Sequence, residues 1–129
     1  MRIRGAIVGA ALGALAAAAI HYLLAGSARP LLALFLALTA CVYLGALLAQ
    51  TQTLLTTVGE LLVGGAVFVC AFLGVAFSAL WLVAGYVLHG AWDWLHETKT
   101  VPTHVAAWFP PACAAFDFVI AGFVLSFMT

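Results

Sequence analysis

Two histidines and an aspartate, His89, Asp93 and His96, have the types and spacing needed for metal chemistry. On an α-helix, positions i, i+4 and i+7 leave from one face, within about 60° of arc. Imidazole nitrogens and carboxylate oxygens are ligands for zinc, iron and manganese. The spacing therefore predicts a metal site on one helix face, and a metal-free network of hydrogen-bonded polar side chains is the alternative.

The composition indicates the environment in which these residues lie. The chain has 129 residues, of which 67% are hydrophobic and 6% are charged. A soluble domain carries about 25% charged residues, so this chain cannot cover its surface for water. We expect one integral-membrane domain over residues 1–129. Because the formal net charge is zero, we expect no nucleic-acid partner.

The apolar stretches predict an all-α bundle of about five transmembrane helices. Residues 54–88 are almost wholly apolar. As one helix they would extend roughly 50 Å, beyond a hydrocarbon core of about 30 Å. We therefore expect a turn near Gly74 to Ser78. The predicted spans are 5–26, 31–49, 53–73, 77–97 and 110–128, the last beginning at Pro110 and Pro111.

The first span carries Gly5, Gly9 and Gly13 at every fourth position. Such a row of small residues lets two helix backbones approach closely in lipid. The start of the chain also resembles a signal peptide, but its long apolar stretch favours a retained first span. The row and the short loops favour a homo-oligomer or a subunit of a membrane complex.

The few basic residues predict the orientation. With the N-terminus in the cytoplasm, Arg2, Arg4 and Lys99 lie inside and Arg29 lies outside. This distribution fits the positive-inside rule. We expect the protein in a bacterial inner membrane, with the face bearing His89 at the cytoplasmic end of the fourth helix.

Two further acids, Glu60 and Asp117, fall at similar depth on neighbouring helices, about 10 Å from the cytoplasmic side. An isolated charge there costs at least about 3 kcal/mol, so each acid needs a partner, a proton or a cation. Cys113, one turn before Asp117, is either a thiolate ligand or a packed thiol. We expect Glu60 and Asp117 to be catalytic. The expected metal ligands are His89, Asp93, His96 and Asp117.

These residues predict a divalent transition metal, with zinc the best fit and iron or manganese as alternatives. The leading hypothesis is a metal-dependent enzyme acting on a lipid-like or other hydrophobic substrate, with a carboxylate as base. The alternative is a non-enzymatic membrane subunit or a small proton or cation transporter that uses the same acids. Haem or pigment binding through His89 or His21 is a third hypothesis.

Two short patterns resemble those of an uncharacterised family of small bacterial integral-membrane proteins with no assigned function. The first is HGxWDxxH at residues 89–96, and the second is PPxCxxFD at residues 110–117. The resemblance covers roughly residues 80–120. It implies membership of a membrane family, and it implies no activity.

Overall fold

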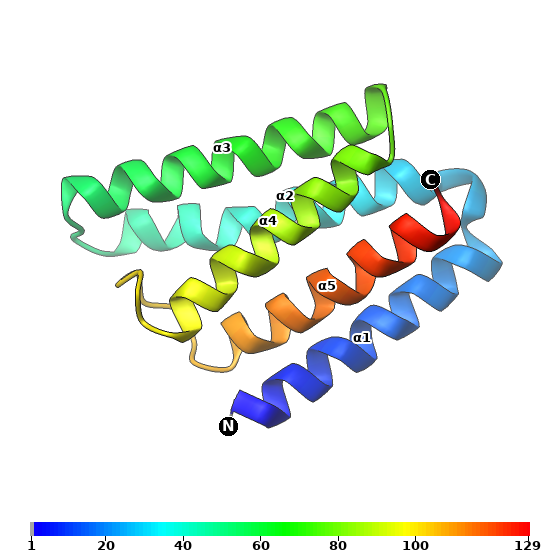
Figure 1. Ribbon diagram of the computed structural model, residues 1–129. Helices are drawn as coiled ribbons and strands as arrows, with labels where there is room; N and C mark the ends of the chain where they lie inside the picture. The colour runs from blue at the N-terminus through cyan, green and yellow to red at the C-terminus, as the bar shows by residue number, and fades with distance from the viewer. Residues whose placement is uncertain (1) are drawn as a thin grey trace.

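The computed structural model describes residues 2–129, most of which are helical (Figure 1). No strand occurs in these residues, which confirms the all-α prediction. The elements are α1 (Arg2–Leu23), the short 3-10 helix η1 (Ala25–Ser27), α2 (Ala28–Ala49), α3 (Leu54–Ala76), α4 (Leu80–Glu97) and α5 (Phe109–Phe127).

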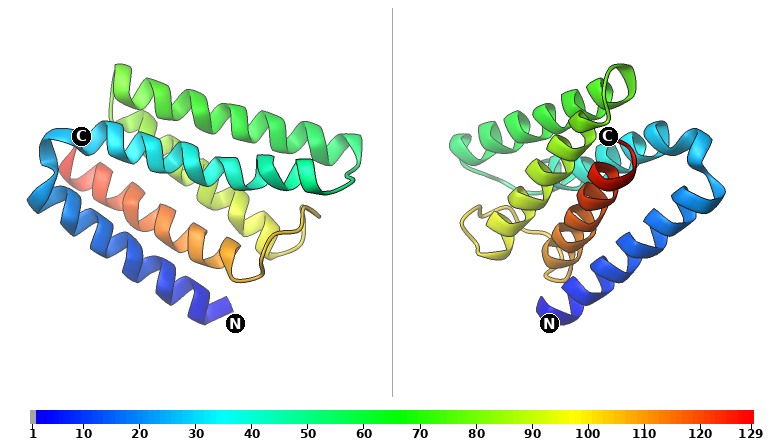
Figure 2. Two further views of the ribbon diagram at one scale, coloured as in Figure 1. Left: turned by 180° about the vertical axis from the view of Figure 1, so that it is seen from behind. Right: turned by 45° about the vertical axis from the view of Figure 1, so that its right-hand side comes forward.

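The helices lie side by side and alternate in direction (Figures 1 and 2). In space the order is α1, α5, α4, α3 and α2, and α2 also contacts α4. The start of α1, the turn at residues 50–53 and the loop at residues 98–108 lie together, and we call this the loop end of the bundle. The C-terminal half of α4 and the N-terminal half of α5 therefore run side by side near the loop end.

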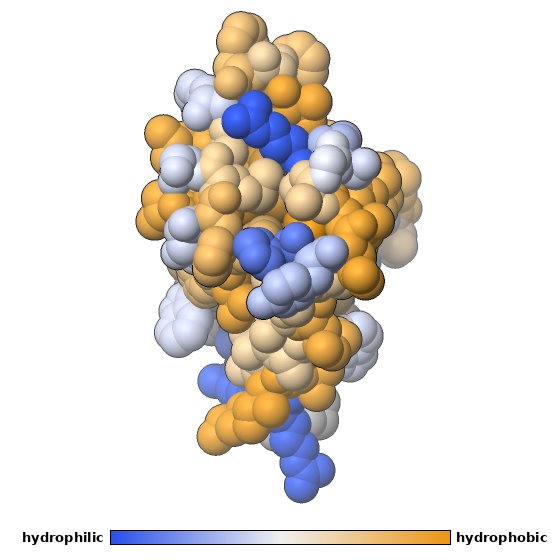
Figure 3. Space-filling view, turned by 90° about the vertical axis from the view of Figure 1, so that its right-hand side faces the viewer, coloured by the Kyte–Doolittle hydropathy of each residue, from blue (hydrophilic) through white to orange (hydrophobic). Residues whose placement is uncertain are grey.

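Four segments are long and apolar enough to cross a membrane: α1, Ala25–Ala49, α3 and α5. This agrees with an integral membrane protein. The prediction of an all-α bundle of about five helices is confirmed, and α4, whose 18 residues include His89, Asp93, His96 and Glu97, is the helix that is not among these four. It packs between α3 and α5. Large apolar side chains are exposed on all five helices, α4 included, and hydrophobic residues cover much of the end opposite the loop end, between a few hydrophilic patches (Figure 3).

The turn between α3 and α4 lies at residues 77–79, at the end of the range that the sequence predicts. Gly74, the expected turn residue, is inside α3. A Cβ atom at Gly74 would lie 2.5 Å from the Leu82 side chain. This glycine therefore allows α3 and α4 to approach closely, and the chain reverses three residues later, where the Ser78 hydroxyl accepts a hydrogen bond from Leu80 N.

The glycine row on α1 packs against α5 of the same chain. A Cβ atom at Gly9 would lie 1.8 Å from the Ala112 carbonyl oxygen, and one at Gly13 would lie 3.1 Å from Val119. The row therefore serves the close helix contact that its spacing predicts. Because it is used within the chain, it gives no support for assembly with other copies, and the oligomeric state stays a prediction.

Candidate metal centre

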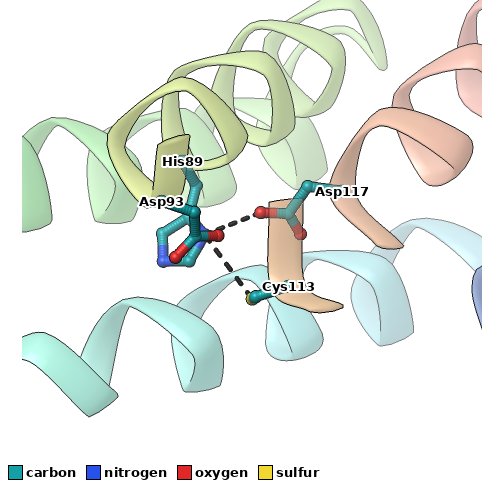
Figure 4. Close-up of side chains that lie close together, drawn as sticks. All are labelled: His89, Asp93, Cys113 and Asp117. Atoms are coloured by element: carbon teal, nitrogen blue, oxygen red, sulfur yellow. Dashed lines mark hydrogen bonds and ion pairs between the residues drawn. The ribbon is translucent and has the colours of Figure 1, made fainter. Parts of the chain in front are cut away.

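Four side chains with metal-binding atoms meet between α4 and α5, and we call them the His89 cluster: His89, Asp93, Cys113 and Asp117 (Figure 4). One ligand atom from each lies within 4.8 Å of the others. All four are buried, and both aspartates are 0% exposed. The cluster combines one imidazole, one thiol and two carboxyl groups.

The contacts within the cluster centre on His89. Its Nδ1 atom lies 2.7 Å from Asp117 Oδ2 and 3.3 Å from Asp93 Oδ2. The Cys113 sulfur lies 4.0 Å from the same nitrogen. Among the described residues, His89 Nε2, Asp93 Oδ2 and Asp117 Oδ1 have no hydrogen-bond partner. The cluster therefore has bonding capacity that the protein itself does not use.

Local sequence explains why these side chains meet. His89 and Asp93 are four residues apart on α4, and Cys113 and Asp117 are four residues apart on α5, so each pair shares a helix face. Between them, a Cβ atom at Gly90 would lie 3.3 Å from Asp117 Cβ. The missing side chain at Gly90 lets the two helices approach closely enough for a hydrogen bond between His89 and Asp117.

The His89 cluster has more acids than bases. Even with a protonated imidazole, the two carboxylates leave one negative charge in a buried place. A charge of this kind is costly in a membrane unless a proton or a cation neutralises it. A divalent metal reduces this imbalance, because with two carboxylates and a neutral imidazole the cluster would have no net charge, and it would have one negative charge if Cys113 also lost its proton.

The donor atoms, all within 4.8 Å of one another, lie near the spacing of a tetrahedral metal site and would have to move closer together to bind one. Zinc binds its ligands at about 2.0 to 2.3 Å, so neighbouring ligand atoms lie roughly 3.3 to 3.8 Å apart. The 4.0 Å and 3.3 Å separations around His89 Nδ1 are close to this range. The 2.7 Å contact with Asp117 is a hydrogen bond, and a metal would replace its proton. A thiolate favours zinc over manganese.

Tyr43 on α2 closes the cluster from a third helix. Its hydroxyl donates a hydrogen bond of 2.5 Å to Asp93 Oδ1. Its ring stacks on that of His96, with centroids 3.9 Å apart. Tyr43 was not predicted from the sequence, although a buried phenol in an apolar helix needs a hydrogen-bond partner and so indicates one nearby.

The other two predicted residues, Glu60 and His96, lie closer to the loop end with Trp92 and Thr103, which were not predicted, and we call these four the Glu60 cluster. The Glu60 carboxylate accepts hydrogen bonds from Trp92 Nε1 at 2.8 Å and Thr103 Oγ1 at 2.5 Å. His96 Nε2 lies 2.8 Å from Glu60 Oε1. The carboxylate is thus held by three groups.

The second hydrogen bond of His96 determines where the protons of the His96–Glu60 pair lie. Its Nδ1 lies 2.8 Å from the Trp92 carbonyl oxygen. Because a carbonyl only accepts, Nδ1 carries a hydrogen. A hydrogen bond between Nε2 and Glu60 then requires a further proton. The pair is therefore either an imidazolium with a carboxylate or a neutral imidazole with a protonated carboxyl group. The Glu60 cluster is therefore balanced in charge and needs no metal.

The structure thus divides the predicted site in two. It brings together His89, Asp93 and Asp117, and it adds Cys113. It does not bring Glu60 or His96 into that group, because His96 lies one helical turn beyond the α5 contact and faces α3 instead. The assignment of five residues to metal binding or catalysis remains a prediction: Glu60, His89, Asp93, His96 and Asp117.

The resemblance found in the sequence is confirmed by a family model that matches residues 4–129, a range that includes both clusters. The chain belongs to the Family of unknown function (DUF6010). No curated protein and no solved structure matches the chain. The function of this member of DUF6010 therefore has to be inferred from its own geometry.

The loop end of this DUF6010 protein is held by hydrogen bonds and by an ion pair between Arg2 and Glu97, 2.6 Å long. α4 ends because Lys99 adopts a left-handed conformation, with φ 60°, and Thr100 N then bonds Leu95 O at 2.9 Å. The Gln50 side chain donates to the His104 carbonyl at 2.6 Å and accepts from its N–H at 3.0 Å.

Two cavities flank the Glu60 cluster. The larger, of about 530 Å³, lies at the loop end and is lined by residues that include Arg2, His96, Lys99, Thr103 and His104. The smaller, of about 10 Å³, lies between the two clusters and is lined by residues that include Tyr43, Glu60, His89 and Trp92. The smaller one leaves no room for a substrate beside the His89 cluster.

His21 lies at the opposite end of the bundle. It is exposed, and its ring centroid is 5.2 Å from that of Phe127. His21 therefore lies at the exposed edge of the contact between α1 and α5. His21 and His89 do not share a site.

Proposed function

We propose that this membrane-embedded protein binds one divalent transition metal, preferably zinc, in the His89 cluster. The observation that carries the proposal is a buried set of two carboxyl groups, one thiol and one imidazole within 4.8 Å. Its members have unpartnered atoms and a negative charge that no basic side chain of the cluster balances. A metal would bind the unpartnered atoms, would offset the negative charge of the carboxylates and would join α4 to α5.

Transport by a single chain has less support. From the His89 cluster toward the far end, the core consists of apolar side chains with 0% exposure, among them Leu36, Leu82, Ile120 and Val124. Protons and cations need polar groups or water to cross such a layer. Among residues 2–129, Tyr86 is a buried polar side chain in this layer, and its hydroxyl is already used in a hydrogen bond to the Leu32 carbonyl oxygen.

We also propose that the loop end faces the cytoplasm in a bacterial inner membrane. Arg2 and Lys99 line the same cavity at this end, Arg4 lies in the first turn of α1, and Arg29 begins α2 at the other end. This distribution supports the orientation through the positive-inside rule.

The metal content of detergent-purified protein tests the main proposal. We expect about one zinc per chain in the wild type and a loss of most of it in His89→Ala, because an imidazole ligand is removed. His21→Ala is the matched control, since it removes an exposed histidine at the other end. Elemental analysis showing little metal in the wild type, or equal metal in His89→Ala, would contradict the proposal.

An enzyme acting on a lipid-like substrate, with the metal of the His89 cluster in a structural role, is the second candidate, favoured by the larger cavity, which adjoins the Glu60 cluster. Its volume of about 530 Å³ is in the range of ligand sites. Arg2 and Lys99 on its wall suit an anionic head group. Thr103 and His96 also line it and both contact Glu60, which would act as base while Asp117 stays with the metal.

Turnover of phospholipid vesicles by the zinc-loaded protein tests this candidate. We expect water-soluble head-group products, detected by mass spectrometry, and at least a hundredfold slower release in Glu60→Gln, because a general base contributes about 10² to 10⁴. Absence of any lipid product from the zinc-loaded wild type would contradict an enzyme of this class without affecting metal binding.

A further inference from the structure

We infer that a single water molecule binds in the small cavity between the two clusters and connects His89 to Glu60. The inference assigns Glu60 a role as positioning residue for the metal site, and this role rests on the proposed metal binding. The water site itself rests on geometry alone.

The cavity has the size and the lining that a buried water requires. Its volume is about 10 Å³, close to the roughly 10 to 15 Å³ that one water needs. It lies among α2, α3 and α4, and its polar walls are Tyr43, Glu60, His89 and Trp92. Ala40 is among the apolar residues that complete the wall.

His89 lines this cavity and carries an unpartnered ring nitrogen. His89 is 1% exposed, and its Nε2 atom has no hydrogen-bond partner in the described chain. Its Nδ1 edge faces Asp117, so Nε2 lies on the opposite side of the ring (Figure 4). Because His89 lines the cavity, we assign its Nε2 atom to the polar wall of this cavity.

Glu60 and Tyr43 provide the other hydrogen-bond partners that a buried water needs. Glu60 has carboxylate lone pairs, and the Tyr43 oxygen is free to accept because its hydrogen is donated to Asp93. A water that accepts from His89 Nε2–H and donates to Glu60 and Tyr43 makes three hydrogen bonds, the usual number for a buried water. The bridge joins the charge-balanced Glu60 cluster to the His89 cluster.

This bridge matters once Nδ1 binds a metal. A neutral imidazole bound through Nδ1 carries its hydrogen on Nε2. Metal-binding histidines almost always donate this hydrogen to a carboxylate, a carbonyl or a water, and the loss of such a partner weakens metal binding about 10- to 100-fold. Glu60, through the water, is the carboxylate in position to orient His89.

Two variants test whether a water connects His89 to Glu60. Glu60→Gln removes the charge of the acceptor, and Ala40→Val fills the cavity from α2. For both we expect the zinc dissociation constant to rise about 10- to 100-fold, with a shift of the visible bands of the cobalt-substituted protein. Ala33→Val is the matched control, because it adds the same methyl groups to a buried alanine of α2 that does not line the cavity. Affinities and spectra of both variants equal to those of the control would overturn the positioning role.

A metal-free measurement separates this inference from the proposed function. In the wild type without metal, we expect magnetisation transfer in NMR between a long-lived water and the His89 ring proton Hε1, and its loss in Ala40→Val. Its absence from the wild type would overturn the water site. If the wild type binds no zinc while the transfer is present, the proposed metal function and the positioning role fail and the water site stands.

Discussion

Replacing Asp117 with asparagine should lower zinc affinity about a hundredfold or more and leave the metal-free bundle folded. Structural zinc sites bind their metal with about 10 to 16 kcal/mol, or roughly 3 kcal/mol for each of four ligands. The loss of one ligand therefore corresponds to an increase of about a hundredfold in the zinc dissociation constant. In the metal-free variant, the asparagine amide oxygen still accepts a hydrogen bond from His89, and the excess negative charge of the cluster disappears. The free energy of unfolding of the metal-free variant should therefore be within about 1 kcal/mol of that of the wild type, or higher.

Zinc competition titrations and denaturant unfolding of the same preparations measure the two effects. Glu97→Gln is the control, because it removes a carboxylate whose ion pair with Arg2, 2.6 Å long, lies at the loop end and outside the His89 cluster. A strong loss of stability in metal-free Asp117→Asn, with zinc affinity equal to that of the wild type, would identify the cluster as a hydrogen-bonded ion pair without a metal role.

Replacing Glu60 with alanine should destabilise the bundle by about 3 to 5 kcal/mol, the usual cost of removing one partner of a buried ion pair. The change leaves His96, Trp92 and Thr103 without the acceptor that all three now contact. It also releases the loop at residues 98–108 from α3, since Thr103 Oγ1 is the buried contact between them. We expect faster proteolytic cleavage within this loop.

Unfolding in mixed detergent and limited proteolysis measure these effects. Gln50→Ala provides the comparison, because it removes the outer contact of the same loop at His104 and leaves no buried charge. We expect it to cost about 1 kcal/mol while it also speeds cleavage. If Glu60→Ala matches Gln50→Ala in stability, the Glu60 cluster does not hold the bundle together in the way proposed.

Several features of this protein could be predicted from the sequence because they depend on local patterns. The share of apolar residues requires a membrane environment, and the lengths of the apolar runs set the number of helices. Gly5, Gly9 and Gly13 predict a close helix contact. The i, i+4 spacing of His89 and Asp93, and that of Cys113 and Asp117, predicts two polar helix faces.

Only the tertiary structure decided which of these faces meet. The sequence grouped His96 with His89 because both lie on one face of α4, but neighbouring turns of a helix contact different partners. The close approach at Gly90 turns His89 toward α5, whereas His96, nearer the loop end, meets Glu60 on α3. The Tyr43 hydroxyl, the cavity behind His89 and the inclusion of Cys113 likewise depend on how the helices pack. Helix spacing along the chain determines which side chains share a face, and packing between helices determines what each face binds.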